Sequence, residues 1–275
     1  MFLNEKIFFI LRPFYIQGYW VWFIKTKSAM RKLILPFLLI SVGLVSCKKE
    51  KEDLSGMQMG NNFYPTQIGK YIVYNYDSTV YDDVKQLTAH LTGQVRYYVA
   101  DTFRDADGRL AYTVKVQKRA NDTDPYLVND VITVTPTDDH VEMEQKTLTF
   151  IKLAFPVANG KSWNGNALLP ATDNDSAYDE FNKFQQSWNY TYSDYDTDFQ
   201  PNAKLYEHTV TVNEISDTLG NPDTDSTAYA YKNFSKEIYA YNVGLIYKER
   251  TYWEYKPEVG YRKGYSVILK AVDNN

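Results

Sequence analysis

From residue 62 onward, apolar and polar positions alternate along the chain with a period of two. Between residues 110 and 118, for example, Tyr112, Val114 and Val116 alternate with polar side chains. This period places apolar side chains on one face of a strand and polar side chains on the other. One solvated face is typical of an antiparallel sheet. The pattern therefore predicts antiparallel β-structure for this part of the chain.

Turn signals divide this part of the chain into strands. The acidic turn Asp105–Gly108 separates segments 94–102 and 110–118, which are expected to form a hairpin. Further strands are expected at 71–76, 87–92, 127–135, 140–145, 148–155, 205–215, 226–233, 245–255 and 261–272. Helical signals are weak, and one or two short helices are expected, at 177–186 and 234–241.

This count of strands predicts an all-β, antiparallel domain spanning residues 62–275. Twisted sheets of about ten strands usually curl or split into two packed layers. A curled sheet or half-barrel, a closed barrel and a two-layer sandwich all fit the pattern. A curled sheet would leave a concave, aromatic-lined face, whereas a sandwich would fill that space with its core.

A separate pattern precedes the domain. Arg31 and Lys32 are followed by a 14-residue apolar run, 33–46. That run is too short to span a bilayer, which takes roughly 20 residues, but it suits a secretory signal. We interpret 30–46 as a signal peptide, 47–61 as a flexible tether, and 1–29 as an extension upstream of the true start. Segment 7–24 is alternatively a poor transmembrane segment.

The end of the apolar run resembles the lipobox of bacterial lipoproteins. Its residues are Leu44, Val45 and Ser46, followed by Cys47, the single cysteine of the chain. The resemblance implies cleavage before Cys47 and attachment of acyl chains, such as palmitate, to that residue. Two or more chains anchor a protein stably to a membrane. The charged run 49–53 is similar to export signals of Bacteroidota surface lipoproteins, or is simply a solvated part of the tether.

Three short blocks of the domain extend this resemblance. The first block is NFYP at 62–65 with GKYIVY at 69–74 and DS at 77–78, the second is FPV at 155–157 with GKSWNGN at 160–166, and the third is IYAYNVGLIYKE at 238–249. Together they are similar to uncharacterised envelope lipoproteins of Bacteroidota, with Tyr71 where those proteins usually have Trp. The resemblance implies a lipid-anchored protein of the cell envelope, in or at the outer membrane, and it carries no catalytic residue.

Charge and composition exclude several classes of function. The chain has 275 residues, with 30 basic and 34 acidic side chains, and residues 47–275 hold 24 and 33 of these. An acidic domain argues against nucleic-acid binding, which needs clustered Lys and Arg. A single cysteine excludes a disulfide framework. The expected partners are the membrane, which the chain contacts through the lipid anchor on Cys47, and a glycan or an envelope protein.

Candidate catalytic chemistry is sparse. His90, His140 and His208 lie far apart in sequence and lack metal-binding spacing. The acidic run 194–198 could hold Ca²⁺ on one face, although a solvated loop is the simpler interpretation. No G-x-S-x-G or dinucleotide-binding motif occurs. We therefore expect no enzyme activity, no metal and no cofactor.

Tyrosine supplies the main binding hypothesis, since the chain contains 25 of them. Tyr190, Tyr192 and Tyr195 are expected to form an exposed cluster that stacks on a glycan or a protein. Trp163, between two Asn-Gly turns, either caps the core or joins such a site. The domain is then a binding or structural module. The alternative is a carrier that holds a lipid or other apolar ligand in a concave pocket of several hundred Å³.

The sequence also contains candidate sites for O-glycosylation. Four Asp-Ser or Asp-Thr pairs resemble the O-glycosylation sequon of exported Bacteroidota proteins. Their hydroxyl residues are Ser78, Ser176, Thr218 and Ser226. Asp-Ser is equally a common turn starter.

Overall fold

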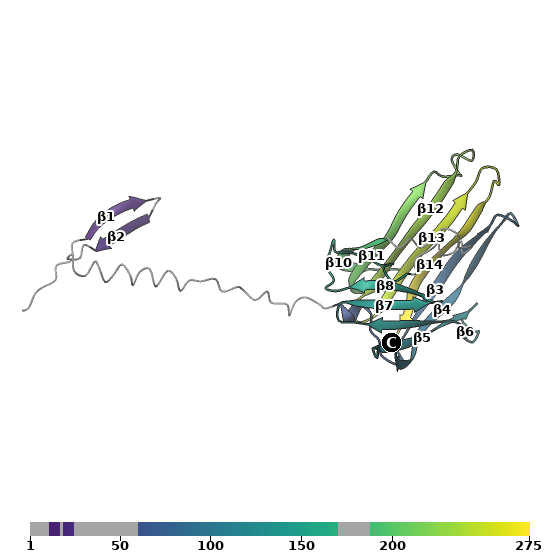
Figure 1. The fold of residues 1–275 in the computed structure, drawn as a ribbon, viewed down its shortest axis with the longest axis horizontal. Coiled ribbons are helices and arrows are strands. Elements are labelled where there is room, and N and C mark those ends of the chain that lie inside the picture. Colours follow the sequence, from purple (N-terminus) through teal and green to yellow (C-terminus); the bar gives the residue numbers. More distant parts are fainter. Residues whose placement is uncertain (1–10, 17–18, 25–59, 170–187) are drawn as a thin grey trace, which may run out of the picture. The chain divides into compact units, whose positions relative to one another are not determined.

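The structure is a computed structural model, and it describes residues 11–16, 19–24, 60–169 and 188–275 (Figure 1). The chain divides into two units, 1–54 and 55–275. In the first unit, strands β1 (Leu11–Ile16) and β2 (Tyr19–Ile24) pair antiparallel. The lipobox with Cys47, the serine Ser176 and the helix expected at 177–186 all lie outside the described residues. The described ranges contain no helix long and apolar enough to cross a membrane.

The second unit is built on one sheet of twelve strands, β3 to β14. Its strands are β3 (Tyr71–Asp82), β4 (Leu87–Arg104), β5 (Leu110–Arg119), β6 (Leu127–Pro136), β7 (His140–Gln145), β8 (Leu148–Ala154), β9 (Ser162–Asn164), β10 (Asn189–Phe199), β11 (Tyr206–Leu219), β12 (Ala230–Ala240), β13 (Gly244–Tyr255) and β14 (Arg262–Asn274). All neighbours are antiparallel. The last strand, β14, pairs with the first, β3, and so joins the two halves of the sheet.

The sheet curls until its two edges nearly meet. On edge strand β8, the Ile151 amide donates to the Gly165 carbonyl at 2.8 Å. The Trp163 indole on β9 donates to the Ile151 carbonyl at 2.9 Å. The result is a nearly closed, barrel-like sheet. The expected all-β, antiparallel class is confirmed, and among the alternatives the curled sheet is the one observed.

Segments 234–241 and 189–199 differ most from the sequence prediction. Residues 234–241 were expected to be helical, but 234–240 belong to strand β12, where the ladders to β11 and β13 satisfy the backbone on both sides. Residues 189–199 form strand β10, which the alternation did not identify. Positive φ angles at Asp194 and Asp196 interrupt that strand and its register with β11.

Long hairpins give one wall of the barrel extra height. The hairpins β3–β4, β11–β12 and β13–β14 extend past the shorter strands β5 to β8 on one side (Figure 1). The core fills the opposite part of the interior, below these extensions. Its largest fully buried members include Tyr74, Leu153, Val134, Val141, Val210, Val212, Tyr239 and Ile246.

Candidate ligand-binding cavity

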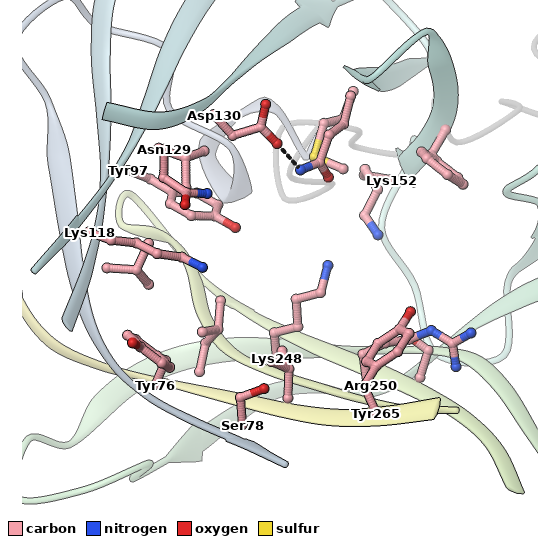
Figure 2. Close-up of a pocket in the computed structure, with 18 of the residues that line it drawn as sticks. Tyr76, Ser78, Tyr97, Lys118, Asn129, Asp130, Lys152, Lys248, Arg250 and Tyr265 are labelled. Carbon is pink, nitrogen blue, oxygen red and sulfur yellow. Dashed lines mark hydrogen bonds between the residues drawn. The ribbon is translucent and has the colours of Figure 1, made fainter. Parts of the chain in front are cut away.

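A cavity of about 400 Å³ lies inside the curled sheet, between the core and the extended wall (Figure 2). Its lining comes from β3 to β8 and from β10 to β14, so strands far apart in sequence meet around one space. On β3, β5 and β14 the lining residues alternate, as the pleat requires for a shared inner face, whereas on β6 the neighbours Asn129 and Asp130 both line the cavity beside a register shift. This volume is within the range of about 300–1,000 Å³ that is usual for small-ligand sites.

Three lysines reach into the cavity from different strands. Figure 2 shows the Nζ atoms of Lys118 (β5), Lys152 (β8) and Lys248 (β13) directed into the same space. Lys152 is almost fully buried, with 4% of its side chain exposed, while Lys248 is 24% exposed. A buried ammonium needs compensating partners, because desolvation disfavours its charged form.

Two glutamates on β11 and β12 supply that compensation. Lys152 Nζ makes a short contact with Glu214 Oε1 and lies 2.8 Å from Glu237 Oε2. Lys248 Nζ lies 2.9 Å from Glu237 Oε1. Hydroxyl groups complete the network, with Ser235 donating to Glu214 and Tyr239 donating to Glu237. Both oxygens of each glutamate are therefore engaged.

The network shifts the ionisation of its members. Burial acts to raise the pKa of Glu237, but Lys152 and Lys248 lower the pKa to about 2. For Lys152, burial acts to lower the pKa, but Glu214 and Glu237 hold it well above its ordinary value. For Lys248 too, burial acts to lower the pKa and Glu237 acts to raise it. The net effect is a raised pKa. All three groups are charged at neutral pH.

The rest of the lining mixes apolar and polar groups. Asp130 accepts a hydrogen bond from Gln145 at 2.6 Å, drawn as a dashed line in Figure 2. Arg250 lies at the base of the extended wall and donates to the Asn233 side chain at 2.7 Å. The apolar lining residues are Leu91, Val95, Val116, Met143, Phe150, Val267 and Leu269.

Apolar side chains continue beyond the cavity along the extended wall. Leu91 is 51% exposed and lies opposite Ser78, a lining residue of β3. Val80 and Leu87 are also exposed and lie on the same face as this pair, farther along the hairpin. The cavity thus opens onto an exposed apolar strip, which we define as Val80, Leu87 and Leu91.

The prediction that Tyr190, Tyr192 and Tyr195 form an exposed cluster is wrong, because two of the three are buried. Tyr190 and Tyr192 are 2% and 1% exposed, because they belong to strand β10 and face the barrel interior. The Tyr192 hydroxyl accepts from the Ala154 amide at 2.9 Å and donates to the Ala154 carbonyl at 3.2 Å. The Tyr190 hydroxyl donates to the Asn166 side chain at 3.0 Å. Instead of an outer patch, Tyr190 contributes to the lining of the cavity.

The other two aromatic candidates are half-buried and pack against the core. Trp163 lies 4.5 Å from Tyr192 between ring centroids, and its indole hydrogen bond ties β9 to β8. It therefore acts as the core cap that the sequence offered as one alternative. Tyr195 makes an edge contact with Phe63, at 6.4 Å between centroids. No cluster of exposed tyrosines forms among Tyr190, Tyr192 and Tyr195.

The glycosylation candidates fall into different environments. Ser78 lines the cavity and is only partly exposed. Thr218 and Ser226 are exposed near the β11–β12 connection, where they remain candidates for modification. Ser176 lies outside the described residues.

The three histidines do not meet. His140 lies between Asp139 at 2.6 Å and Glu142 at 3.0 Å, while His208 pairs with Asp196 and His90 contacts Thr79. Among the described residues, no group of three metal-ligating side chains is close enough to hold an ion. The carboxylate of Asp196 is directed to His208, and the run 194–198 forms no shared acidic site within the described range.

Sequence reasoning expected a pocket of this size in the carrier alternative, but expected it to be apolar. The volume agrees, whereas the lysine–glutamate network was not anticipated. Lys152 and Glu214 are 62 residues apart, and Lys152 interrupts an otherwise apolar stretch of β8. A charge at an inward-facing strand position was the one signal present, and it does not reveal its partner.

Comparisons with known proteins give only distant likenesses, all to solved structures. No family model and no curated protein matches the chain. Among solved structures, the chain is similar to a candidate exported protein with a YmcC-like fold from Bacteroides fragilis. The two are 15% identical with a TM-score of 0.32, and the alignment covers 77% of this chain and 99% of that one. At that similarity the neighbour assigns no function to this chain.

Proposed function

We propose that the chain is a lipid-anchored protein of the cell envelope whose curled sheet binds a small, partly apolar ligand in its interior. The anchor is Cys47, and the tether 47–61 links it to the domain. The role is binding or carriage and not catalysis. The resemblance of residues 44–47 to a lipobox supports the location, and the cavity supports the binding role.

The single observation that carries the binding role is the cavity and its continuation into the apolar strip. Solvent-exposed apolar side chains are common when scattered, but a row that leads into a cavity is typical of ligand sites. Leu91 is the link between the two, because it lines the cavity and belongs to the strip. Burying this surface against a ligand would be favourable by about 25 cal/mol per Å².

A neutral fluorescent probe, N-phenyl-1-naphthylamine, tests this proposal on the purified full chain. We expect saturable binding that Leu91→Asp weakens about tenfold, equivalent to about 1.4 kcal/mol. Leu205→Asp is the matched control, since Leu205 is 52% exposed against 51% for Leu91 but lies outside the cavity lining. Absence of binding to the unmodified chain, or equal loss in both variants, would overturn the proposal.

A further inference from the structure

Lys118 and Lys248 approach the cavity from separate walls. Lys118 is on β5 and Lys248 is on β13, and Figure 2 shows both Nζ atoms facing the space above Tyr76 and Ser78. Lys118 Nζ lies 5.4 Å from the centre of the Tyr76 ring, a cation–π contact at the rim. Both ammonium groups therefore line the accessible part of the cavity, whereas Lys152 lies deeper.

The acidic groups near these lysines are already engaged. Glu237 is 1% exposed and is not part of the cavity lining, and its carboxylate binds Lys152, Lys248 and Tyr239. Glu214 binds Lys152 and Ser235, and Asp130 accepts from Gln145. Glu237 thus holds Lys248 from outside the cavity lining, while Asp130 pairs with neither lysine in the described part of the chain.

The lysines keep donors for a ligand. An ammonium group has three N–H donors, and Glu237 is the one carboxylate that Lys248 contacts within the described part of the chain. In the same part of the chain, Lys118 forms no ion pair within 4.0 Å. Donors of both residues remain available on the cavity side.

We propose that Lys118 and Lys248 form an anion subsite, so that the ligand is an amphiphile with one acidic head group and an apolar chain. The head group, a carboxylate or a phosphate, lies between the two lysines. The chain extends over Leu91 toward Val80 and Leu87. This inference deepens the proposed function, since it names the chemical class that the same cavity takes.

The charge of the lining favours this class over its alternatives. A wholly apolar ligand would remove water from Lys248 and Lys118 without replacing their hydrogen bonds, which is costly. A cationic head group would meet like charges. An acidic head group forms charge-assisted hydrogen bonds, which are about twice as strong as neutral ones. A small inorganic anion could bind the two lysines, but it would leave the exposed apolar strip uncovered.

Matched ligands separate the two proposals. Dodecanoate, dodecyl phosphate and neutral dodecanol share one chain, and each is titrated against the bound neutral probe on the full protein. We expect one or both anions to bind at least tenfold more tightly than dodecanol, with a preference that falls as salt is added. The tighter of the two anions identifies the head group.

Charge-removing variants assign the residues. Lys118→Gln is expected to raise the dissociation constant of the anion about tenfold and to leave dodecanol unchanged. Lys115→Gln is the control, because Lys115 is exposed on the opposite face of β5. Lys248→Met is the second variant, used with a Tm measurement because Lys248 also supports Glu237.

The outcomes distinguish the inference from the proposed function. Equal affinity for dodecanol and both anions would overturn the anion subsite and leave the apolar cavity standing. A preference for anions that survives in Lys118→Gln and Lys248→Met would also overturn it. Failure of all three ligands and of the probe to bind would overturn both proposals.

Discussion

Lys152 is the residue on which the interior charge network depends. It is the common partner of Glu214 and Glu237, and its side chain is 4% exposed. Lys152→Met would leave two buried carboxylates with reduced compensation. Breaking a buried pair in this way typically costs about 3–5 kcal/mol. We expect urea unfolding to show a loss of that order, while Lys85→Met, at a lysine with 76% side-chain exposure, changes stability little.

The same network predicts acid sensitivity through Glu237. Its pKa is about 2 in the folded chain against an ordinary value of 4.5. Between these values the unfolded state binds the proton more readily, so folding stability falls as pH falls. The contribution is complete above pH 4.5 and is lost as the pH approaches 2.

Replacement of the carboxyl group tests that dependence. Glu237→Gln cannot titrate, so its free energy of unfolding is lower than that of the unmodified chain at neutral pH, and the gap narrows between pH 4.5 and 2. Unfolding curves at a series of pH values measure the gap. A gap that stays constant across this interval would contradict the assignment to Glu237.

At the scale of elements, edge strand β8 is joined to the other end of the sheet at a seam formed by its hydrogen bonds to Trp163 on β9 and Tyr192 on β10. The Tyr192 hydroxyl bonds both backbone groups of Ala154, and a net hydrogen bond is worth about 1 kcal/mol. Tyr192→Phe keeps the ring and removes these bonds. We expect a loss of about 1–2 kcal/mol, because the Ala154 amide and carbonyl are left unsatisfied.

Hydrogen exchange measures this effect locally. Protection of the Ala154 amide should fall in Tyr192→Phe, while amides of β13 and β14 keep theirs. Tyr195→Phe is the control, since Tyr195 lies on the same strand, is half-buried, and its hydroxyl forms no hydrogen bond to β8 or β9 within the described part of the chain. Equal protection of the Ala154 amide in the two variants would show that the seam does not depend on Tyr192.

Most strands could be predicted because their alternation is local. Strand β7 was expected at 140–145 and lies at His140–Gln145, with one face buried against the core. Strand β10 escaped because its inward residues are tyrosines and its end carries Asp194, Asp196 and Asp198, a composition shared with exposed loops. Residues 234–240 were misassigned because Glu237 occupies an inward position where alternation predicts an apolar side chain.

The cavity belongs to the whole molecule and could not be derived from any one segment. Its walls come from eleven strands, and the sheet order that joins β14 to β3 decides which of them face each other. The presence of a cavity could be anticipated, because a curled sheet must enclose or expose a concave face. The charge of its lining could not be anticipated, since Lys118, Lys152 and Lys248 come together only after the sheet has curled.

Anchoring is the property of the whole chain that remains to be measured. If residues 30–46 are a lipoprotein signal, the mature polypeptide begins at Cys47, which carries acyl groups. Two or more acyl groups hold a protein stably in the membrane. Intact mass of membrane-extracted protein, with N-terminal peptide mapping, should show an acylated Cys47 and no residues 1–46.

Cys47→Ala should prevent processing and lipid attachment. Because the cavity belongs to the unit 55–275, the same variant should keep its affinity for the neutral probe. A chain that retains residues 1–46 with an unmodified cysteine would contradict the anchor but leave the ligand site intact.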